Sequence, residues 1–476
     1  MIKYFKKLFR SQKTKVFVLG IDGAPPQLIF DQWLNDLPNI KKLMDNSIYG
    51  RMSSSVPPST IVAWTSMLSG KDPSHFDVYS YTYKDEENKI RLSSSSNVKA
   101  KRIWKYLDQL GKKSILLNVP LTYPVEELNG IMIGGFLSPE FNDKSVYPAG
   151  IRKEIERNYT ANYPFDVSVG LAGYKNLDTD KMIERSYQMT KLNLDISKDF
   201  IINKKWDFFM IVLLGSDRMQ HTMWRFHDVN HRRYPGETKY KNSLKEYYQF
   251  VDREIEEIKS KLDKNTYLII ASDHGFDRMD GRINLNDWFI REGYLVLKEV
   301  PKEPGKLDFK NVDWSKTKCY AIGAYFGRIY FNRKNRDPNN GIIEENQIEI
   351  LQDELITKLK SLKNDLGEGM DTTAFKSQDI YDGPYKENGP DLYLYFDQLK
   401  WGVNNDVGNE GLYSQRTTKG SDDAGHGPTG LFMLHHPSIV KQERNDIEII
   451  DVLPTIFSVM GIKEKIEGEF KGKVLI

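Results

Sequence analysis

Six aspartates and histidines in this chain are placed so that they could bind metal ions: Asp22, Asp217, His221, Asp273, His274 and His426. Asp217 and His221 are four residues apart, so one turn of helix would put both on the same face. Asp273 and His274 are adjacent, and we expect them to point to different sides of a tight turn. Nitrogen and carboxylate ligands suit zinc or manganese, and six ligands are too many for one tetrahedral ion. The set therefore predicts two metal ions.

A hydroxyl nucleophile is available in the segment VPPSTIVAWTSMLSGKDP. Ser59 and Thr60 follow two prolines and precede an apolar run that ends at Gly70, which predicts a helix with a hydroxyl at its start. The free N–H groups and the dipole of such a helix stabilise an anion at that end. The alternative is that Thr60 is only the N-cap of this helix, which is the commoner use of threonine there.

Three apolar runs end on these candidate ligands: KVFVLGID, WDFFMIVLLGSD and TYLIIASDHG. Their unbroken apolar content predicts buried strands of a parallel sheet, and KSILLNVP at 113–120 is a fourth candidate. The stretch 243–262 has apolar residues at helical spacing. Strands that alternate with helices predict an α/β fold, in which ligands bind at the carboxyl ends of the strands. An aspartate after a strand can also simply cap the next helix.

The chain divides into four regions. We expect a metal-binding α/β core at residues 15–283 and 421–476, with a helical insertion at 141–200. Residues 284–420 are expected to form an inserted cap or lobe, with one strand at YAIGAYFGRIYFN and a helix at 344–362. Residues 1–14 form a basic N-terminal tail.

Composition excludes several classes of protein. With 476 residues, 39% of them hydrophobic and 28% charged, the chain is neither disordered nor collagen-like. Its one cysteine excludes an intramolecular disulfide and favours a reducing compartment, so we expect a cytoplasmic protein. The formal charge of +2 gives no basic field for specific nucleic-acid binding. The six positive charges of residues 1–15 leave a formal charge of −4 on the remainder.

The basic tail could make weak peripheral contact with an anionic membrane, because Ile2, Phe5 and Leu8 fall near one helical face among lysines. The alternative is a solubilising tail. No apolar run approaches the length of about 18 residues that crosses a bilayer.

Five motifs occur in an order that resembles the alkaline phosphatase superfamily. They are GIDGA at 20–24, PPSTIVAWTSMLSGKDP at 57–73, SDRMQH at 216–221, SDHGF at 272–276 and GHGPTG at 425–430. They are most similar to the type I phosphodiesterase/nucleotide pyrophosphatase family, in its cytoplasmic prokaryotic branch. The resemblance covers nearly the whole chain and implies a central, mostly parallel sheet flanked by helices.

The resemblance also implies the roles of the candidate residues. Asp22, Asp273, His274 and Thr60 would bind one metal ion, and the other would lie between Asp217, His221 and His426. Thr60 would attack phosphorus and form a phosphothreonine intermediate, with one ion lowering the pKa of its hydroxyl. The implied activity is hydrolysis of phosphodiester or phosphoanhydride bonds in a small phosphate-ester substrate.

One departure from the family leaves the substrate open. The family has an asparagine about 21 residues beyond the nucleophile that binds a phosphoryl oxygen, where this chain has Tyr81. Tyr81 or Asn118 could replace it, and Tyr123 could line the leaving-group pocket. A phosphomonoesterase or phosphotransferase on the same fold, or a non-catalytic binding module, are the alternatives. The oligomeric state is not predicted.

Overall fold

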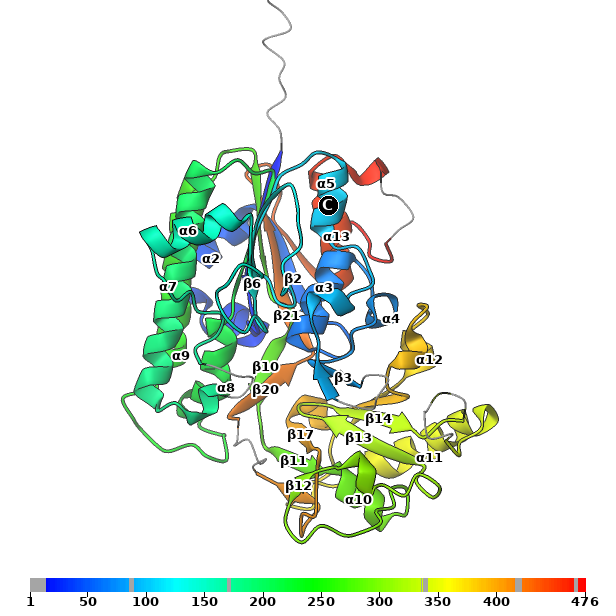
Figure 1. Ribbon diagram of the computed structural model, residues 1–476. Helices are drawn as coiled ribbons and strands as arrows, with labels where there is room; N and C mark the ends of the chain where they lie inside the picture. Colours follow the sequence, from blue (N-terminus) through cyan, green and yellow to red (C-terminus); the bar gives the residue numbers. More distant parts are fainter. Residues whose placement is uncertain are drawn as a thin grey trace, which may run out of the picture.

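The computed structural model describes residues 14–84, 90–168, 173–334, 336, 341–415, 422–465 and 470–476. Residues 1–13, which hold nearly all of the basic tail, lie outside these ranges, so both interpretations of the tail, membrane contact and solubilisation, stay predictions. Figure 1 shows two parts, a larger one built around a central sheet and a smaller lobe beside it.

A nine-stranded sheet forms the centre of the larger part, in the order β22-β2-β21-β9-β1-β8-β5-β6-β7. The strands β9, β1, β8, β5 and β6 are parallel neighbours. Antiparallel pairs join β9 to β21, β21 to β2 and β6 to β7, while β22 runs parallel to β2. The strand bounds are β1 Lys15–Ile21, β2 Ser47–Ser53, β5 Ser114–Asn118, β6 Gly130–Gly135, β7 Val146–Tyr147, β8 Phe208–Leu213, β9 Thr266–Ala271, β21 Thr429–His435 and β22 Gln442–Glu448. The predicted mostly parallel α/β sheet is confirmed.

Helices cover both faces of this sheet, which is why its central strands are apolar without alternation. In β1, Phe17 and Leu19 belong to one buried cluster, while Val16 and Val18 belong to another on the opposite face. The helices of the first cluster are α2 Pro38–Leu43, α6 Ala149–Asn158, α7 Thr179–Asn203, α8 Gly215–His227 and α9 Ser243–Lys261. Those of the second are α3 Thr60–Ser69, α5 Ile103–Gln109 and α13 Val452–Val459, and α3 also contributes Ile61 and Val62 to the first. A short helix, α4, spans Pro73–Phe76.

The four strands and the helix expected in the core are all present, as β1, β5, β8, β9 and α9. The insertion predicted at 141–200 contains α6 and most of α7. Because β9, β1, β8 and β5 are parallel neighbours, the loops that leave their carboxyl ends meet at one edge of the sheet. Asp22, Asn118 and Asp273 lie at these ends, and Asp217 lies in the first turn of α8.

The lobe has a hydrophobic core of its own. It contains a four-stranded sheet in the order β13-β14-β16-β15. Its helices are α10 Leu285–Arg291, α11 Ile348–Lys360 and α12 Ser377–Ile380, and its sheet strands are β13 Cys319–Gly323, β14 Gly327–Phe331, β15 Thr373–Lys376 and β16 Leu392–Tyr395. The helix predicted at 344–362 is confirmed as α11. The boundaries of the lobe at 284 and 420 remain a prediction.

The single strand predicted at YAIGAYFGRIYFN is wrong, because this segment forms a hairpin of β13 and β14. Gly323 and Gly327 are paired at the end of the ladder, and Ala324, Tyr325 and Phe326 make the turn between them. The turn points toward the carboxyl edge of the central sheet, where the Tyr325 hydroxyl lies 3.4 Å from His221 Nε2.

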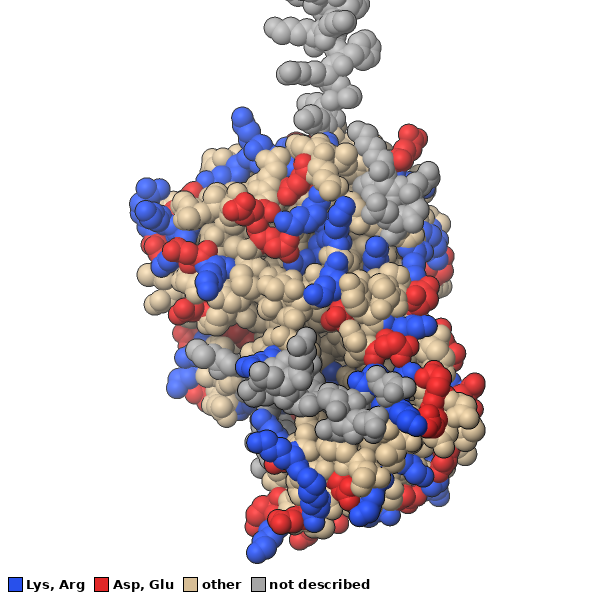
Figure 2. Space-filling model, turned by 45° about the vertical axis from the view of Figure 1, so that its right-hand side comes forward, with Lys and Arg blue, Asp and Glu red and all other residues tan. Residues whose placement is uncertain are grey.

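Smaller sheets complete the fold. They are formed by β3 Thr82–Lys84, β4 Ile90–Leu92, β10 Gly275–Arg278, β11 Gly281–Asn284, β12 Gly305–Lys306, β17 Trp401–Asn404, β18 Asp406–Val407, β19 Tyr413–Ser414 and β20 Ala424–Gly427. Among the residues described, none of the helices combines the length and apolar character needed to span a bilayer. In Figure 2, positive and negative side chains are interspersed over the visible face of both parts.

Candidate active site

The six candidate ligands lie together at the carboxyl edge of the sheet, and all are buried. Asp22 follows β1, Asp273 and His274 follow β9, and α8 carries Asp217 and His221. His426 lies in β20, opposite Phe276 of β10. The aspartates do not cap helices, because α8 has Leu214 as its N-cap and β9 leads into strand β10. The alternative interpretation of these aspartates is therefore wrong.

Each of the three aspartates has one carboxylate oxygen fixed by a donor and the other free. The fixed oxygens are Asp22 Oδ2, which accepts from Trp64 Nε1 at 3.0 Å, Asp273 Oδ1, which accepts from the Gly23 amide at 3.1 Å, and Asp217 Oδ2, which accepts from Arg218 at 2.6 Å. The other oxygens, Asp22 Oδ1, Asp217 Oδ1 and Asp273 Oδ2, are buried and have no hydrogen-bond partner in the part of the chain that the structure describes. A buried carboxylate oxygen without a donor is costly unless a cation faces it.

A backbone carbonyl fixes the ring orientation of each of the three histidines. The Nδ1 atoms of His221, His274 and His426 lie 2.9 Å, 3.0 Å and 2.9 Å from the carbonyl oxygens of Ala424, Gly275 and Pro58. A carbonyl only accepts, so each Nδ1 carries the proton and each Nε2 has a free lone pair. This arrangement is typical of histidines that bind metal ions.

These lone pairs face the free carboxylate oxygens. His274 Nε2 lies 3.3 Å from Asp273 Oδ2 and 3.6 Å from Asp22 Oδ1. The Nε2 atoms of His221 and His426 each lie 3.5 Å from Asp217 Oδ1. Ligands about 2.0–2.1 Å from a tetrahedral zinc ion would be about 3.3 Å apart, so these residues fit divalent cations. The expectation that Asp273 and His274 point apart is wrong, because the turn after β9 brings both to one place.

The candidate ligands form two groups of three residues whose ligand atoms all lie within 4.8 Å of one another. One is Asp22, Asp273 and His274, and the other is Asp217, His274 and His426. His274 belongs to both, since its ring stacks on His426 with centroids 3.7 Å apart. His221 lies outside these two groups but shares Asp217 Oδ1 with His426.

The three buried carboxylates lie close enough to repel one another when they are ionised. Burial and the nearby Asp217 raise the pKa of Asp22 well above its ordinary value, and burial and Asp22 do the same for the pKa of Asp273. Burial also opposes ionisation of Asp217, but His221 and Arg218 lower its pKa well below the usual range. Positive charge in this space would stabilise all three carboxylates.

Thr60 is the first residue of α3, and Ser59 rather than Thr60 is the N-cap. The alternative role of Thr60 as the cap is therefore wrong. Its Oγ1 lies 3.4 Å from His274 Nε2 and accepts a hydrogen bond of 3.1 Å from the hydroxyl of Tyr81. The hydroxyl thus lies beside the first of the two ligand groups and at the positive end of a ten-residue helix.

The structure separates the three predicted substrate contacts. Tyr81 reaches Thr60 directly. Asn118 ends β5 with a φ of 57°, and its Oδ1 accepts from Tyr163 at 2.7 Å. Its buried Nδ2 has no partner among the residues that the structure describes. Tyr123 is half-buried in the following loop. Among the described residues, no hydrogen bond, ion pair or ring contact links its side chain to Thr60 or to the six candidate ligands.

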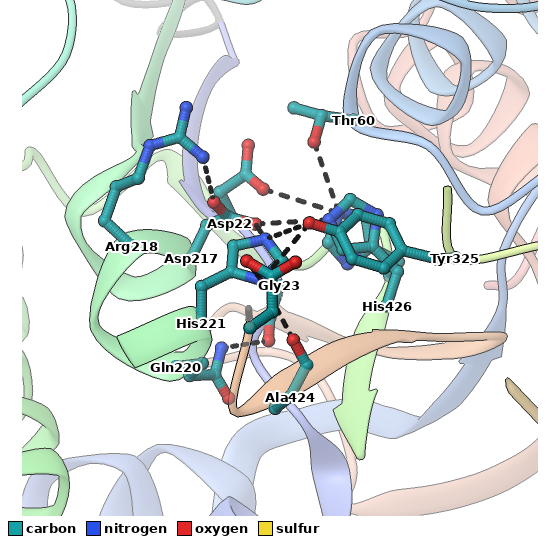
Figure 3. A network of polar contacts seen from close by, with 12 residues as sticks. Asp22, Gly23, Thr60, Asp217, Arg218, Gln220, His221, Tyr325, Ala424 and His426 are labelled. Carbon is teal, nitrogen blue, oxygen red and sulfur yellow. Dashed lines mark hydrogen bonds and ion pairs between the residues drawn. The ribbon is translucent and has the colours of Figure 1, made fainter. Parts of the chain in front are cut away.

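Tyr325 is a site residue that the sequence did not reveal. It comes from the turn of the lobe hairpin, and its hydroxyl lies 3.4 Å from His221 Nε2. Its ring stacks on His426 with centroids 4.5 Å apart. Figure 3 shows Tyr325 facing the same space as Asp22, Thr60, Asp217, His221 and His426. Burial and Asp422 raise the pKa of Tyr325 well above its ordinary value.

Two residues behind the site were also missed as functional. Arg218 binds Asp217 and makes a two-point ion pair with Asp166 at 2.9 Å and 2.8 Å. Trp64 is fully buried, and its Nε1 donates to Asp22 Oδ2. The arginine lies inside the motif SDRMQH, so its position beside Asp217 was the available signal.

The sequence model of the type I phosphodiesterase/nucleotide pyrophosphatase family matches residues 16–423. A comparison with curated proteins gave no match. Solved structures share the fold at low identity. An inactive variant of murine ectonucleotide pyrophosphatase/phosphodiesterase 5, in complex with AMP, is 12% identical with a TM-score of 0.54, covering 94% of this chain and 95% of that one. Phosphonoacetate hydrolase from Sinorhizobium meliloti 1021, in complex with phosphonoformate, is 12% identical with a TM-score of 0.59, covering 95% and 96%. The family match extends over most of the chain, which therefore belongs to the type I phosphodiesterase/nucleotide pyrophosphatase family and is a hydrolase of that type.

Proposed function

We propose that this protein hydrolyses phosphodiester or phosphoanhydride bonds with Thr60 as the nucleophile and two divalent cations, zinc or manganese. Asp22, Asp273, His274 and Thr60 would hold one cation, and Asp217, His221 and His426 the other. The observation that carries the proposal is that three free carboxylate oxygens face three imidazole lone pairs beside the Thr60 hydroxyl. When bound, the cations supply positive charge that lowers the pKa of a hydroxyl and stabilises a leaving oxygen.

The chain's own groups orient the attack. Thr60 at the start of α3 presents its oxygen at an end of the helix where free N–H groups favour an anion. Tyr81 donates to that oxygen, so its hydroxyl stabilises negative charge there. Attack on phosphorus would form a phosphothreonine and release the first product, and water would then regenerate the free threonine.

Two further donors face the substrate in this proposal. The unpartnered Nδ2 of Asn118 would bind a phosphoryl oxygen in place of the family's asparagine. The Tyr325 hydroxyl would donate to an oxygen of the substrate beside His221, because a phenol is protonated at neutral pH. The lobe would thereby complete the site. Tyr123, which is half-buried in the loop after β5, would line the leaving-group pocket.

A substrate panel tests this function. Purified protein is assayed with bis-p-nitrophenyl phosphate, p-nitrophenyl phosphate, a nucleoside triphosphate and a nucleotide sugar, each with zinc, manganese or magnesium. The proposal expects turnover of the diester or the anhydrides. Exclusive cleavage of the monoester would favour the alternative, a phosphomonoesterase, and no turnover with any metal would favour a binding module. A cytoplasmic location is also part of the proposal, because the single cysteine, Cys319, is a buried free thiol.

A further inference from the structure

A cavity of about 810 Å³ opens beside the candidate active site. Its walls come from the loop after β6, from the segment that leads into α7, and from α7 itself. The apolar wall residues that carry the argument are Phe136, Leu137, Tyr163, Phe165, Met189 and Leu192. This volume lies in the range of small-molecule sites and is far larger than a phosphate group requires.

Phe136 connects the cavity to both halves of the site. Its ring meets the ring of Tyr81 edge to face, with centroids 5.8 Å apart, and Tyr81 bonds Thr60. The guanidinium of Arg218 lies 4.9 Å from the same ring, and Arg218 bonds Asp217. A substituent on a phosphorus atom held at Thr60 would therefore have this cavity as a neighbour.

The polar side chains of the wall are mostly committed to protein partners. Asp166 is bound by Arg218, the Tyr163 hydroxyl donates to Asn118, and Gln188 Nε2 donates to Glu184. The hydroxyls of Ser138 and Ser168 are the buried wall atoms without a partner among the described residues. Such a wall offers few hydrogen bonds to a ligand, so the ligand that fits it is mainly hydrocarbon.

Leu137 supports a binding role for this wall. It has a φ of 79°, in the left-handed region that a leucine adopts only at a cost of about 1–2 kcal/mol. Glycine or asparagine would occupy this backbone conformation more easily. The leucine at this position supplies apolar surface to the cavity at the expense of backbone stability, and such strain is typical of functional sites.

From these contacts we infer that the cavity binds a large apolar substituent of the phosphate ester, and so selects diesters that carry a hydrocarbon chain or ring. The inference rests on the proposed function, because it names the substrate class of the same site. The hydroxyls of Ser138 and Ser168 offer the occupant a few polar contacts, and the charged wall residues Glu140 and Arg185 already bond Asn142 and the Val167 carbonyl.

The test compares p-nitrophenyl diesters that differ only in their second substituent. Methyl, hexyl, 1-naphthyl and thymidine-5′ esters share one leaving group, so kcat/KM reports the contribution of the other substituent. We expect the hexyl or naphthyl ester to exceed the methyl ester by at least about tenfold, and the two separate a chain from a ring. Equal values across the series, or a preference for the thymidine ester over both, would overturn the inference.

Two variants change the cavity by different means, one by filling it and the other by making its wall less apolar. Leu192→Trp fills it from a half-buried position on α7, and Ile202→Trp, at a 63% exposed position of the same helix, is the matched control. Leu137→Asn removes apolar wall while relieving the backbone, so its Tm should be unchanged or higher. Both cavity variants should lose the apolar preference, measured as the ratio of kcat/KM for the hexyl and methyl esters, whereas the Ile202→Trp control should keep the wild-type ratio. A preference that survives in both would contradict the inference.

Direct binding separates this inference from the proposed function. Hexylphosphonate and methylphosphonate are titrated calorimetrically into wild-type protein and both cavity variants. Tighter binding of hexylphosphonate to wild type alone supports the cavity even if no diester is hydrolysed, a result that would overturn only the proposed function. Hydrolysis of diesters with equal binding of the two phosphonates would overturn only the cavity.

Discussion

The Tyr81 hydroxyl donates a hydrogen bond of 3.1 Å to Oγ1 of Thr60, the atom that would attack phosphorus. Removing this donor should leave the nucleophile in place but less well stabilised. We expect Tyr81→Phe to lower kcat about tenfold, the equivalent of one hydrogen bond of about 1–1.5 kcal/mol. The melting temperature should change little, because the ring can keep its contact with Phe136.

Tyr83→Phe is the matched control for this change, since Tyr83 is 41% exposed two residues further along. Steady-state kinetics on bis-p-nitrophenyl phosphate measures both variants. Equal rates for the Tyr81 variant and wild type would show that the hydrogen bond does not assist the attack.

Chelation should destabilise the protein. Without cations, the buried carboxylates of Asp22, Asp217 and Asp273 face one another, and burial raises the pKa of Asp22 and Asp273. A cation at 100 times its dissociation constant stabilises the folded state by about 2.7 kcal/mol per site. We expect EDTA to lower Tm and added zinc or manganese to restore it, measured by differential scanning fluorimetry. His426→Ala should bind fewer ions per chain by elemental analysis. An unchanged Tm and an unchanged metal content would contradict the assigned ligands.

The lobe should contribute to turnover through one hydroxyl. Tyr325→Phe keeps a ring against His426 but removes the oxygen that lies 3.4 Å from His221 Nε2. We expect kcat to fall about tenfold while the metal content and Tm stay at wild-type values. Tyr330→Phe is the control, because Tyr330 lies in β14 of the same hairpin and its ring stacks on Tyr320. A kcat equal to that of wild type would show that the Tyr325 hydroxyl does not contribute to turnover.

Acid should destabilise the fold partly through His231. Burial lowers the pKa of His231 below its ordinary 6.5, while its Nδ1 accepts from the Arg233 amide and its Nε2 faces the Asp423 carbonyl. The unfolded state binds a proton at His231 more readily than the folded state does. The contribution of neutral His231 to the free energy of unfolding is therefore fully present above pH 6.5 and is lost as the pH falls through the folded-state pKa. The free energy of unfolding of the EDTA-treated protein is measured with urea at pH 7.5 and 5.5. Between these two pH values it should decline less for His231→Gln than for wild type. The same decline in both would show that His231 is not responsible.

Much of the core was predictable because its signals are local. The strands β1, β8 and β9 are unbroken apolar runs, and each is followed within four residues by a candidate ligand. In a parallel sheet, the carboxyl ends of neighbouring strands share one edge, so residues as far apart in the chain as Asp22 and Asp273 were expected to lie together. Thr60 was predictable for a similar reason, since two prolines and an apolar run mark a helix start.

The rest of the site depends on contacts that no local pattern encodes. The segment around Tyr325 is rich in residues with high strand propensity, and only two glycines hint at the turn that carries this tyrosine to His221. The ion pair between Arg218 and Asp166 joins residues 52 positions apart, and its partner choice follows from tertiary packing. The convergence of Asp273 and His274 was missed because it depends on the backbone angles of one turn.

The covalent role of Thr60 is tested most directly by mass spectrometry. Wild-type protein and Thr60→Ala are mixed with bis-p-nitrophenyl phosphate and the preferred metal, quenched in acid within milliseconds to seconds, and digested. The account predicts a nitrophenyl phosphate adduct on the peptide containing Thr60, formed in step with the first nitrophenolate released. The variant should carry no adduct, and its turnover should fall by at least about 1,000-fold, although it still binds cations. Turnover by Thr60→Ala at the wild-type rate, with no adduct on Thr60 in wild type, would contradict the account.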